Sequence, residues 1–122
     1  MIATNNMITS LKDNQIFVFG SNLNGFHGGG AAKQAYEQFG AEWGVSEGIT
    51  GNCYSFPTLD KEMKRVGLED LELSKRKLYN TANSMPEKEF LLTPVGTGIA
   101  GFSLDVIKEL FKDCPFNITK LF

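Results

Sequence analysis

The sequence is poor in the residues that carry most metal and redox chemistry. It has one histidine, His27, and two cysteines, Cys53 and Cys114, which are far apart in the chain. A zinc site normally needs a cluster of cysteine and histidine, and a redox dithiol needs Cys-x-x-Cys. We therefore expect no metal and no cofactor. Two isolated thiols are typical of apolar side chains in a reducing compartment.

Long apolar runs and a strong net charge are also missing. No segment approaches the roughly 18 apolar residues of a membrane-spanning helix. The polar stretch 1–11 lacks the basic start and apolar run of a signal peptide, so we expect a cytoplasmic protein without membrane contact. The formal net charge is −2, whereas proteins that neutralise a nucleic-acid backbone are normally basic. Bulk nucleic-acid binding is disfavoured, but backbone amides could still hold one nucleotide.

Short apolar runs alternate with helical periodicities along residues 1–122, a length that suits one domain. We predict strands at 16–19, 52–56, 90–95 and 117–121 and helices at 31–39, 68–84 and 104–112. Pro57 is expected to close the second strand, and Ser103 to cap the third helix. Tyr36 and Leu68 fall on apolar helix faces. This order predicts a compact three-layer α/β domain with a central, mostly parallel or mixed sheet and helices on both faces.

Glycine is clustered in two segments, 20–30 and 96–101. Each cluster follows an apolar strand and precedes a helix, so both should lie at the carboxyl edge of the sheet, where α/β proteins bind ligands. A helix N-terminus there offers unpaired N–H groups and partial positive charge, which hold phosphate without Lys or Arg. Two such loops predict a diphosphate site. The alternative is that both are only tight connections.

The second cluster matches the dinucleotide fingerprint Gly96-x-Gly98-x-x-Gly101, but a Rossmann dehydrogenase is not indicated. That fingerprint needs an acidic residue about 20 positions later, where this chain has Leu121 and Phe122. Neither cluster contains the Gly-Lys-Ser/Thr of a P-loop, so a P-loop NTPase is excluded as well.

Several single residues are candidates for chemistry near these loops. His27 can transfer a proton near neutral pH or contact a ligand, with an exposed loop histidine as the alternative. Asp60 follows the second strand and is a candidate base or sugar contact, or else a cap for the next segment. Cys53 has no basic neighbour and is expected to be buried. Trp43 is expected to pack, with stacking on a base as the alternative. The charged segment 61–77 is expected to be a solvated helix face, with a protein-binding surface as the alternative.

Two segments resemble the ligand loops of macrodomains, which are ADP-ribose-binding α/β modules. Ser21-Asn22, followed by Gly28-Gly29-Gly30-Ala31 and a helix, resembles their first ligand loop. Residues 95–102, Val-Gly-Thr-Gly-Ile-Ala-Gly-Phe, resemble their second, phosphate-gripping loop. Most of residues 16–121 also resembles small bacterial and phage proteins of the macrodomain-like group, through segments 17–23, 54–58 and 96–101. The resemblance implies a macrodomain-like fold and a nucleotide ligand similar to ADP-ribose.

The resemblance also implies roles for the matching residues. Asn22 matches the asparagine that contacts the distal ribose, with Ser21 beside it, and Phe102 matches an aromatic residue that flanks this ribose. The other implied ligand-binding residues are Gly28, Gly29, Gly30, Ala31, Gly96, Thr97, Gly98, Ile99, Ala100 and Gly101. Macrodomains usually carry an aspartate that reads adenine, and this chain has Met7 in that place.

We therefore predict that the protein binds ADP-ribose or a related nucleotide diphosphate through its two glycine-rich loops. The first alternative is hydrolysis of an ADP-ribose linkage or phosphate. In that reaction Asn22 would orient a water, with His27 or Asp60 as the base. The second alternative is a small protein-interaction module whose glycine loops are purely structural. The sequence predicts no oligomeric state.

Overall fold

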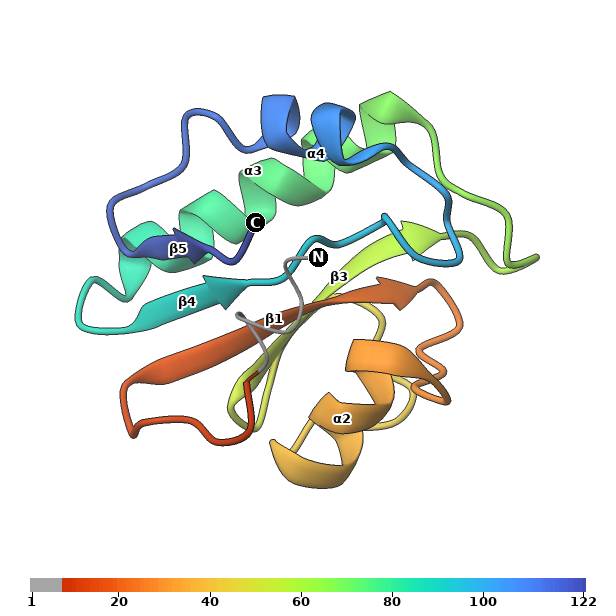
Figure 1. Cartoon of the computed structure of the whole chain (residues 1–122). Helices are drawn as coiled ribbons and strands as arrows, with labels where there is room; N and C mark the ends of the chain where they lie inside the picture. Colours follow the sequence, from red (N-terminus) through yellow and green to blue (C-terminus); the bar gives the residue numbers. More distant parts are fainter. Residues whose placement is uncertain (1–7) are drawn as a thin grey trace.

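The computed structural model describes residues 8–122 and shows a five-stranded sheet in the order β2-β3-β1-β4-β5 (Figure 1). The strands are β1 (Gln15–Asn22), β2 (Gly48–Thr50), β3 (Cys53–Leu59), β4 (Glu89–Leu92) and β5 (Ile118–Lys120); the helices are α2 (Gly30–Gln38), α3 (Leu68–Ser84) and α4 (Leu104–Leu110). Strands β3, β1, β4 and β5 run parallel to one another, and β2 is antiparallel to β3. The predicted mostly parallel α/β sheet is confirmed.

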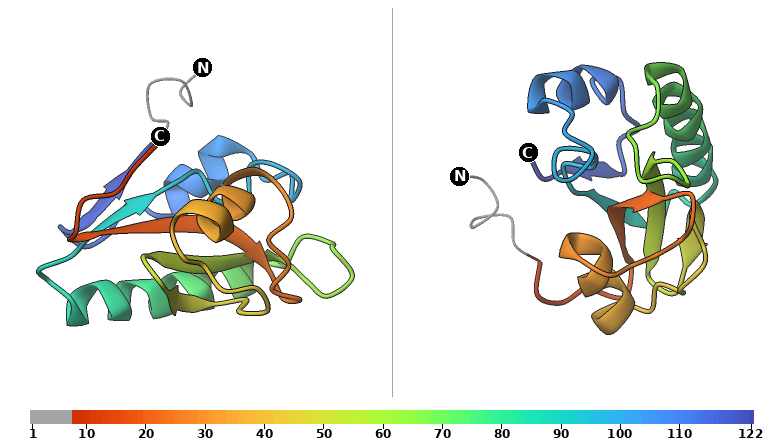
Figure 2. Two further views of the ribbon diagram at one scale, coloured as in Figure 1. Left: turned by 90° about the horizontal axis from the view of Figure 1, so that it is seen from below. Right: turned by 90° about the vertical axis from the view of Figure 1, so that its right-hand side faces the viewer.

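Helices cover both faces of the sheet, as predicted. Helix α2 lies on one face, and α3 and α4 lie together on the other (Figures 1 and 2). Side chains alternate between two apolar cores along the central strand β1. Phe17 and Phe19 pack on the α2 side, whereas Ile16 and Val18 pack on the α3 and α4 side. Burial on both faces explains why this strand is apolar throughout.

The region around β3 differs from the prediction in two ways. Residues 40–51, for which no helix or strand is predicted, contain β2, whose three residues are too few for a periodicity to be recognised. Pro57 does not close the strand, because β3 continues to Leu59. Strand β2 pairs only as far as Ser55, opposite Gly48. Pro57 therefore lies beyond the end of β2, on a side of β3 that has no partner strand at this point. The N–H that proline lacks would have made no hydrogen bond in the sheet there.

Two residues assigned to apolar helix faces are exposed. Tyr36 of α2 is 46% exposed and Leu68 of α3 is 63% exposed. Helix α2 meets the sheet through the small residues Ala32 and Ala35, so its buried stripe is narrower than the sequence period indicates. The predicted cap of α4 is confirmed, because the Ser103 Oγ accepts a hydrogen bond from the Val106 N–H at 3.2 Å.

Close backbone approach fixes the end of α2 against the start of β3. Gly40 follows the helix with φ 85°, the left-handed conformation expected of a C-terminal glycine. The Asn52 N–H donates to the Phe39 carbonyl at 2.9 Å. A Cβ added to Gly51 would lie 2.6 Å from the carbonyl carbon of Gly40, so no side chain fits there.

Glu89, at the start of β4, connects three strands. Its carboxylate accepts hydrogen bonds from Gln15 Nε2 of β1 at 2.9 Å and from Thr119 Oγ1 of β5 at 2.7 Å. These bonds favour the ionised form and lower the pKa of Glu89. Because the folded pKa lies below the unfolded one, the stabilisation is present above the unfolded pKa. It is lost as pH falls through the folded pKa.

We expect Glu89→Gln to be less stable than the wild type at pH 7. The difference should shrink as pH falls below the unfolded pKa of about 4.5. Urea unfolding at a series of pH values measures both effects. The exposed neighbour Glu87, changed to Gln, serves as the control and should show no such dependence. Parallel stability curves for the two variants would contradict the role assigned to Glu89.

Candidate functional site

Three loops meet at the edge of the sheet where the parallel strands end. Residues 23–29 follow β1 and form the first glycine loop, and residues 93–103 follow β4 and form the second glycine loop. Residues 60–67 follow β3 and are called the third loop. All three lie on the right-hand side of Figure 1, the side that faces the viewer in the right panel of Figure 2. The second glycine loop approaches β1 closely, since a Cβ added to Gly20 would lie 3.5 Å from the Gly96 nitrogen. The two glycine loops therefore share one edge, as the parallel order predicts.

Asn22, the last residue of β1, shapes the first glycine loop. Its Nδ2 donates to the Phe26 carbonyl at 2.9 Å, and its Oδ1 accepts from the Phe26 N–H at 3.1 Å. Its own carbonyl accepts from the Gly25 N–H at 2.9 Å, which closes a tight turn. Ser21 is buried beside it and its carbonyl accepts from Thr58 Oγ1 at 3.4 Å, so the strand end is held from both sides.

His27 is buried below the first glycine loop, so the alternative of an exposed loop histidine is wrong. Its side chain is only 1% exposed, and its ring meets the Phe19 ring edge-on at 5.3 Å. Its Nε2 lies 2.9 Å from the Glu42 carbonyl and must carry the proton, because a carbonyl can only accept. The Nδ1 is buried without a hydrogen-bond partner among residues 8–122. His27 thus ties the first loop to the segment after α2.

The second glycine loop presents free backbone donors at its tip. Its base is closed by hydrogen bonds from the Thr97 N–H to the Pro94 carbonyl and from the Phe102 N–H to the Gly96 carbonyl. At the tip, three N–H groups donate to no acceptor within the described part of the chain; they belong to Gly98, Ile99 and Ala100. The Ile99 side chain is 84% exposed, so this tip faces solvent.

The two helix N-termini beside these loops are not equivalent. Helix α2 begins after Gly29 without a side-chain cap and has no acidic residue in its first turn. Helix α4 is capped by Ser103 and carries Asp105 in its first turn. The expectation that both helices offer an open N-terminus to phosphate therefore fits α2 and is wrong for α4, whose positive end is already compensated.

Asp60 organises the third loop. Its Oδ1 accepts hydrogen bonds from the Glu62 N–H at 2.8 Å and from the Lys64 N–H at 3.0 Å. These bonds hold Met63 in a left-handed conformation, with φ 63°. The loop meets the first glycine loop where Asn24 Nδ2 donates to the Lys61 carbonyl at 3.0 Å. One oxygen of Asp60 is therefore committed to the turn that follows it.

Arg65 extends the third loop to the second glycine loop, a contact that sequence reasoning missed. Its Nη1 donates to the Gly101 carbonyl at 3.2 Å, and its guanidinium lies 5.0 Å from the centroid of the Phe102 ring. The Phe102 ring is largely buried against Gly96, whose added Cβ would lie 3.0 Å from Phe102 Cδ2. No local sequence signal marks Arg65, because it lies within a run of alternating charges.

The expected burial of Cys53 is confirmed. Its side chain is fully buried, with the Sγ 3.4 Å from the Phe39 carbonyl. Burial raises the pKa of the thiol to about 12, which is far from that of a reactive thiolate. Residues 8–122 contain no group of three or more metal-ligating side chains and no helix long and apolar enough to cross a membrane.

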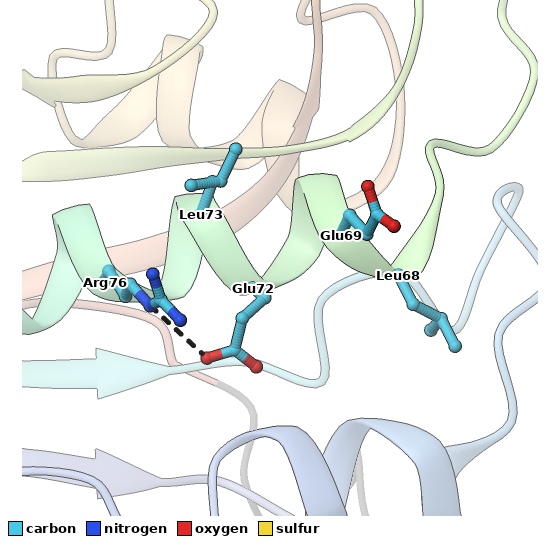
Figure 3. Close-up of a pocket in the computed structure, with 5 residues that line it drawn as sticks. All are labelled: Leu68, Glu69, Glu72, Leu73 and Arg76. Atoms are coloured by element: carbon cyan, nitrogen blue, oxygen red, sulfur yellow. Dashed lines mark ion pairs between the residues drawn. The ribbon is translucent and has the colours of Figure 1, made fainter.

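The charged segment 61–77 forms the third loop and much of α3. Glu72 pairs with Lys75 at 2.6 Å and with Arg76 at 3.8 Å on α3. Figure 3 shows the pair between Glu72 and Arg76. A hollow of about 420 Å³ lies there, and one of about 620 Å³ lies between α3 and α4. Neither hollow is lined by a glycine-loop residue, so both are separate from the candidate site.

The fold can be compared with known structures. The macrodomain of Mycobacterium tuberculosis DarG superposes with a TM-score of 0.69 over 89% of this chain and 88% of that chain, at 16% sequence identity. This chain has a macrodomain-like fold. The prediction from residues 21–31 and 95–102 is therefore confirmed at the level of the fold. Met7, which stands in the place of the adenine-reading aspartate, lies outside the described residues.

Sequence comparison adds nothing to this structural likeness. No protein-family profile matches the chain, and no curated protein is significantly similar to it. At 16% identity the likeness to the DarG macrodomain establishes the macrodomain-like fold alone. Arguments about a ligand must therefore rest on the residues of this site.

Proposed function

We propose that this macrodomain-like protein binds ADP-ribose or a related nucleoside diphosphate, with the phosphates held between its two glycine loops. The resemblance of both loops to macrodomain ligand loops supports this proposal, as does their position at the carboxyl edge of a macrodomain-like sheet. The observation that carries it concerns three positions where neither the backbone conformation nor a close neighbour requires glycine.

Neither backbone conformation nor a close neighbour requires glycine at positions 28, 29 and 98. A Cβ added at any of them would meet no atom within 4 Å, and none has a left-handed φ. By contrast, Gly25 and Gly96 combine a positive φ with close neighbours. A residue without a side chain, in open space at a loop tip, allows a ligand to approach the backbone closely. The three unexplained glycines lie in the two loops that resemble phosphate-binding segments.

Backbone donors at these loops match the chemistry of a diphosphate. The second loop contributes the free N–H groups of residues 98–100. The first loop contributes the uncapped N-terminus of α2, where the helix dipole favours an anion. The site needs no Lys or Arg at its centre for this, which agrees with the acidic balance of the chain.

The other roles follow from the resemblance and from position. Asn22 and Ser21 would lie beside the distal ribose, and Phe102 would flank it, with Arg65 fixing the Phe102 ring from outside. We propose binding rather than hydrolysis, because both candidate bases already have tasks in the loops. His27 donates to the Glu42 carbonyl, and Asp60 holds its turn.

Calorimetric titration with ADP-ribose, ADP, AMP and NAD tests the proposal. We expect ADP-ribose to bind with a Kd on the order of micromolar. Gly98→Glu should weaken binding at least about 100-fold, because it places a side chain and a negative charge where a phosphate must sit. It should leave the free energy of unfolding nearly unchanged, since the position is open.

A charge-matched control separates the site from general electrostatics. Gln38→Glu adds the same negative charge at the far, exposed end of α2 and should bind like the wild type. Equal loss in the two variants would point to charge repulsion alone. The absence of binding with every nucleotide, from protein with a cooperative unfolding transition, would overturn the proposed function.

A further inference from the structure

Three aromatic side chains form an exposed cluster beside the first glycine loop. Phe26 and Trp43 are each 51% exposed, and Tyr36 is 46% exposed. The Phe26 and Trp43 rings are stacked with centroids 5.7 Å apart, and the Tyr36 ring meets Trp43 edge-on at 5.4 Å. We call these three residues the aromatic platform. Trp43 therefore packs on its neighbours, as expected, but half of its surface remains open.

The platform is held together by hydrogen bonds between the first glycine loop and the segment that follows α2. The Gly44 N–H donates to the Gly25 carbonyl at 2.8 Å, and both glycines have a left-handed φ, of 94° and 71°. This contact brings Phe26, which follows Gly25, next to Trp43, which precedes Gly44. The bond from His27 Nε2 to the Glu42 carbonyl joins the same loops a second time. One backbone hydrogen bond and one side-chain hydrogen bond thus hold the two loops, and the rings they carry, in one arrangement.

The size of the platform matches a small flat ligand better than a protein. Three half-exposed aromatic side chains offer on the order of 300 Å², because each ring residue has about 150–250 Å² to bury. A specific protein interface needs about 800 Å² from each partner. Aromatic rings also recognise planar heterocycles through stacking, whatever the hydrogen-bonding edge of the heterocycle.

The position of the platform identifies which heterocycle it fits. Phe26 and His27 lead directly into Gly28 and Gly29, which have open space beside them and end at the uncapped N-terminus of α2. An anion-binding loop therefore adjoins a ring-binding surface within a few residues. A nucleotide combines a planar base and a phosphate in one molecule, linked through a ribose.

We propose that the aromatic platform stacks a nucleobase of the nucleotide that the glycine loops hold. This inference rests on the proposed function and adds a base-binding surface formed by Phe26, Tyr36 and Trp43. Phosphate contacts come from the backbone of the glycine loops, and base contacts come from side chains of the platform. Affinity should therefore depend on the presence of a base, in addition to the phosphates.

Trp43 provides a direct optical test, because it is the only tryptophan in the chain. ADP-ribose and ADP should change its fluorescence in a saturable manner, with the same Kd as in calorimetry. Ribose 5-phosphate and inorganic pyrophosphate, which lack a base, should bind more weakly and leave the emission unchanged. The measurement uses the full chain at a protein concentration well below the expected Kd.

Variants of the platform should separate the base from the phosphates. Phe26→Ala and Trp43→Ala should each weaken ADP-ribose binding about tenfold, and Trp43→Phe should retain most of the affinity. Neither alanine variant should change the binding of pyrophosphate. Leu73→Ala, which removes an exposed apolar side chain from α3, is the control and should bind ADP-ribose like the wild type. Thermal unfolding checks that each variant is folded.

The outcomes distinguish this inference from the proposed function. ADP-ribose binding that is lost in Gly98→Glu but unaffected in fluorescence and in Phe26→Ala would overturn the platform alone. Failure of every nucleotide and phosphate probe to bind would overturn both. A Trp43 emission that changes with protein concentration, together with a dimer in sedimentation, would show that a second copy covers the rings, and would also overturn the platform.

Discussion

Asn117→Asp should lower the free energy of unfolding by about 3–5 kcal/mol at neutral pH, because it places a charge against three carbonyl groups in a buried position. Asn117 is 6% exposed, and its Nδ2 lies 2.9, 3.1 and 3.0 Å from the carbonyl oxygens of Ala82, Met85 and Lys88, which share its two N–H donors. These carbonyls lie at the end of α3 and in the turn before β4. One amide therefore holds the connection between helix and sheet, and a carboxylate of the same shape has no N–H to donate.

The loss should depend on pH in a defined direction. Burial among carbonyl oxygens would raise the folded pKa of the new aspartate above its unfolded value of about 3.9. The part of the penalty that comes from the charge is therefore absent below the unfolded pKa and grows as pH rises above it. Urea unfolding between pH 3 and pH 7 measures this slope, with the pH range chosen to bracket about 3.9.

A matched variant controls for the added charge. Asn83→Asp makes the same chemical change at an exposed position near the end of α3 and should cost less than about 1 kcal/mol, through the helix dipole alone. Equal losses in the two variants, or a loss at Asn117 that does not change with pH, would contradict the role assigned to its amide.

The strand–loop–helix order could be predicted because it rests on burial, which leaves a strong mark on the sequence. β1 is covered on both faces and therefore reads as a continuous apolar run. The loop glycines were visible for a similar reason, since both clusters directly follow such a run. Strand β2 could not be found in this way. It has three residues, and its register depends on the antiparallel pairing of Ile49 with Tyr54.

The shared edge of the candidate site followed from the parallel order, but the contacts that shape it did not. Arg65 and the second glycine loop meet through tertiary packing, and no local pattern encodes that meeting. Tyr36 has the spacing of a buried residue, yet its ring turns to Trp43. The N-terminus of α4 was expected to bind phosphate from its position alone, whereas Asp105 and the cap already compensate it.

The glycines show why composition alone cannot identify a ligand loop. The folded backbone requires glycine at positions 25, 51 and 96, because each combines a left-handed φ with close neighbours. Gly28 and Gly98 meet neither condition. Both kinds occur within the same clusters, so only the structure separates the glycines that fold the loops from those available to a ligand.

Gly25→Ala should lower the free energy of unfolding by about 2–4 kcal/mol. An alanine at φ 71° is strained, and its Cβ would lie 2.6 Å from the Gly44 carbonyl oxygen and 2.7 Å from the Gly44 Cα. Both neighbours are backbone atoms, so the two loops must separate to relieve the clash. Gly28→Ala, three positions later in open space, is the matched control and should cost less than about 0.5 kcal/mol.

The same pair of variants links stability to recognition. Separation of the loops breaks the Gly44–Gly25 hydrogen bond and should shift the Trp43 emission even without a nucleotide. Gly25→Ala should then lose base-dependent binding while pyrophosphate still binds, because the free donors of residues 98–100 lie in the other loop. Gly28→Ala should show the reverse pattern, with an intact platform and weakened phosphate binding. Equal stability of the two variants in urea would contradict the role assigned to the close contact between Gly25 and Gly44.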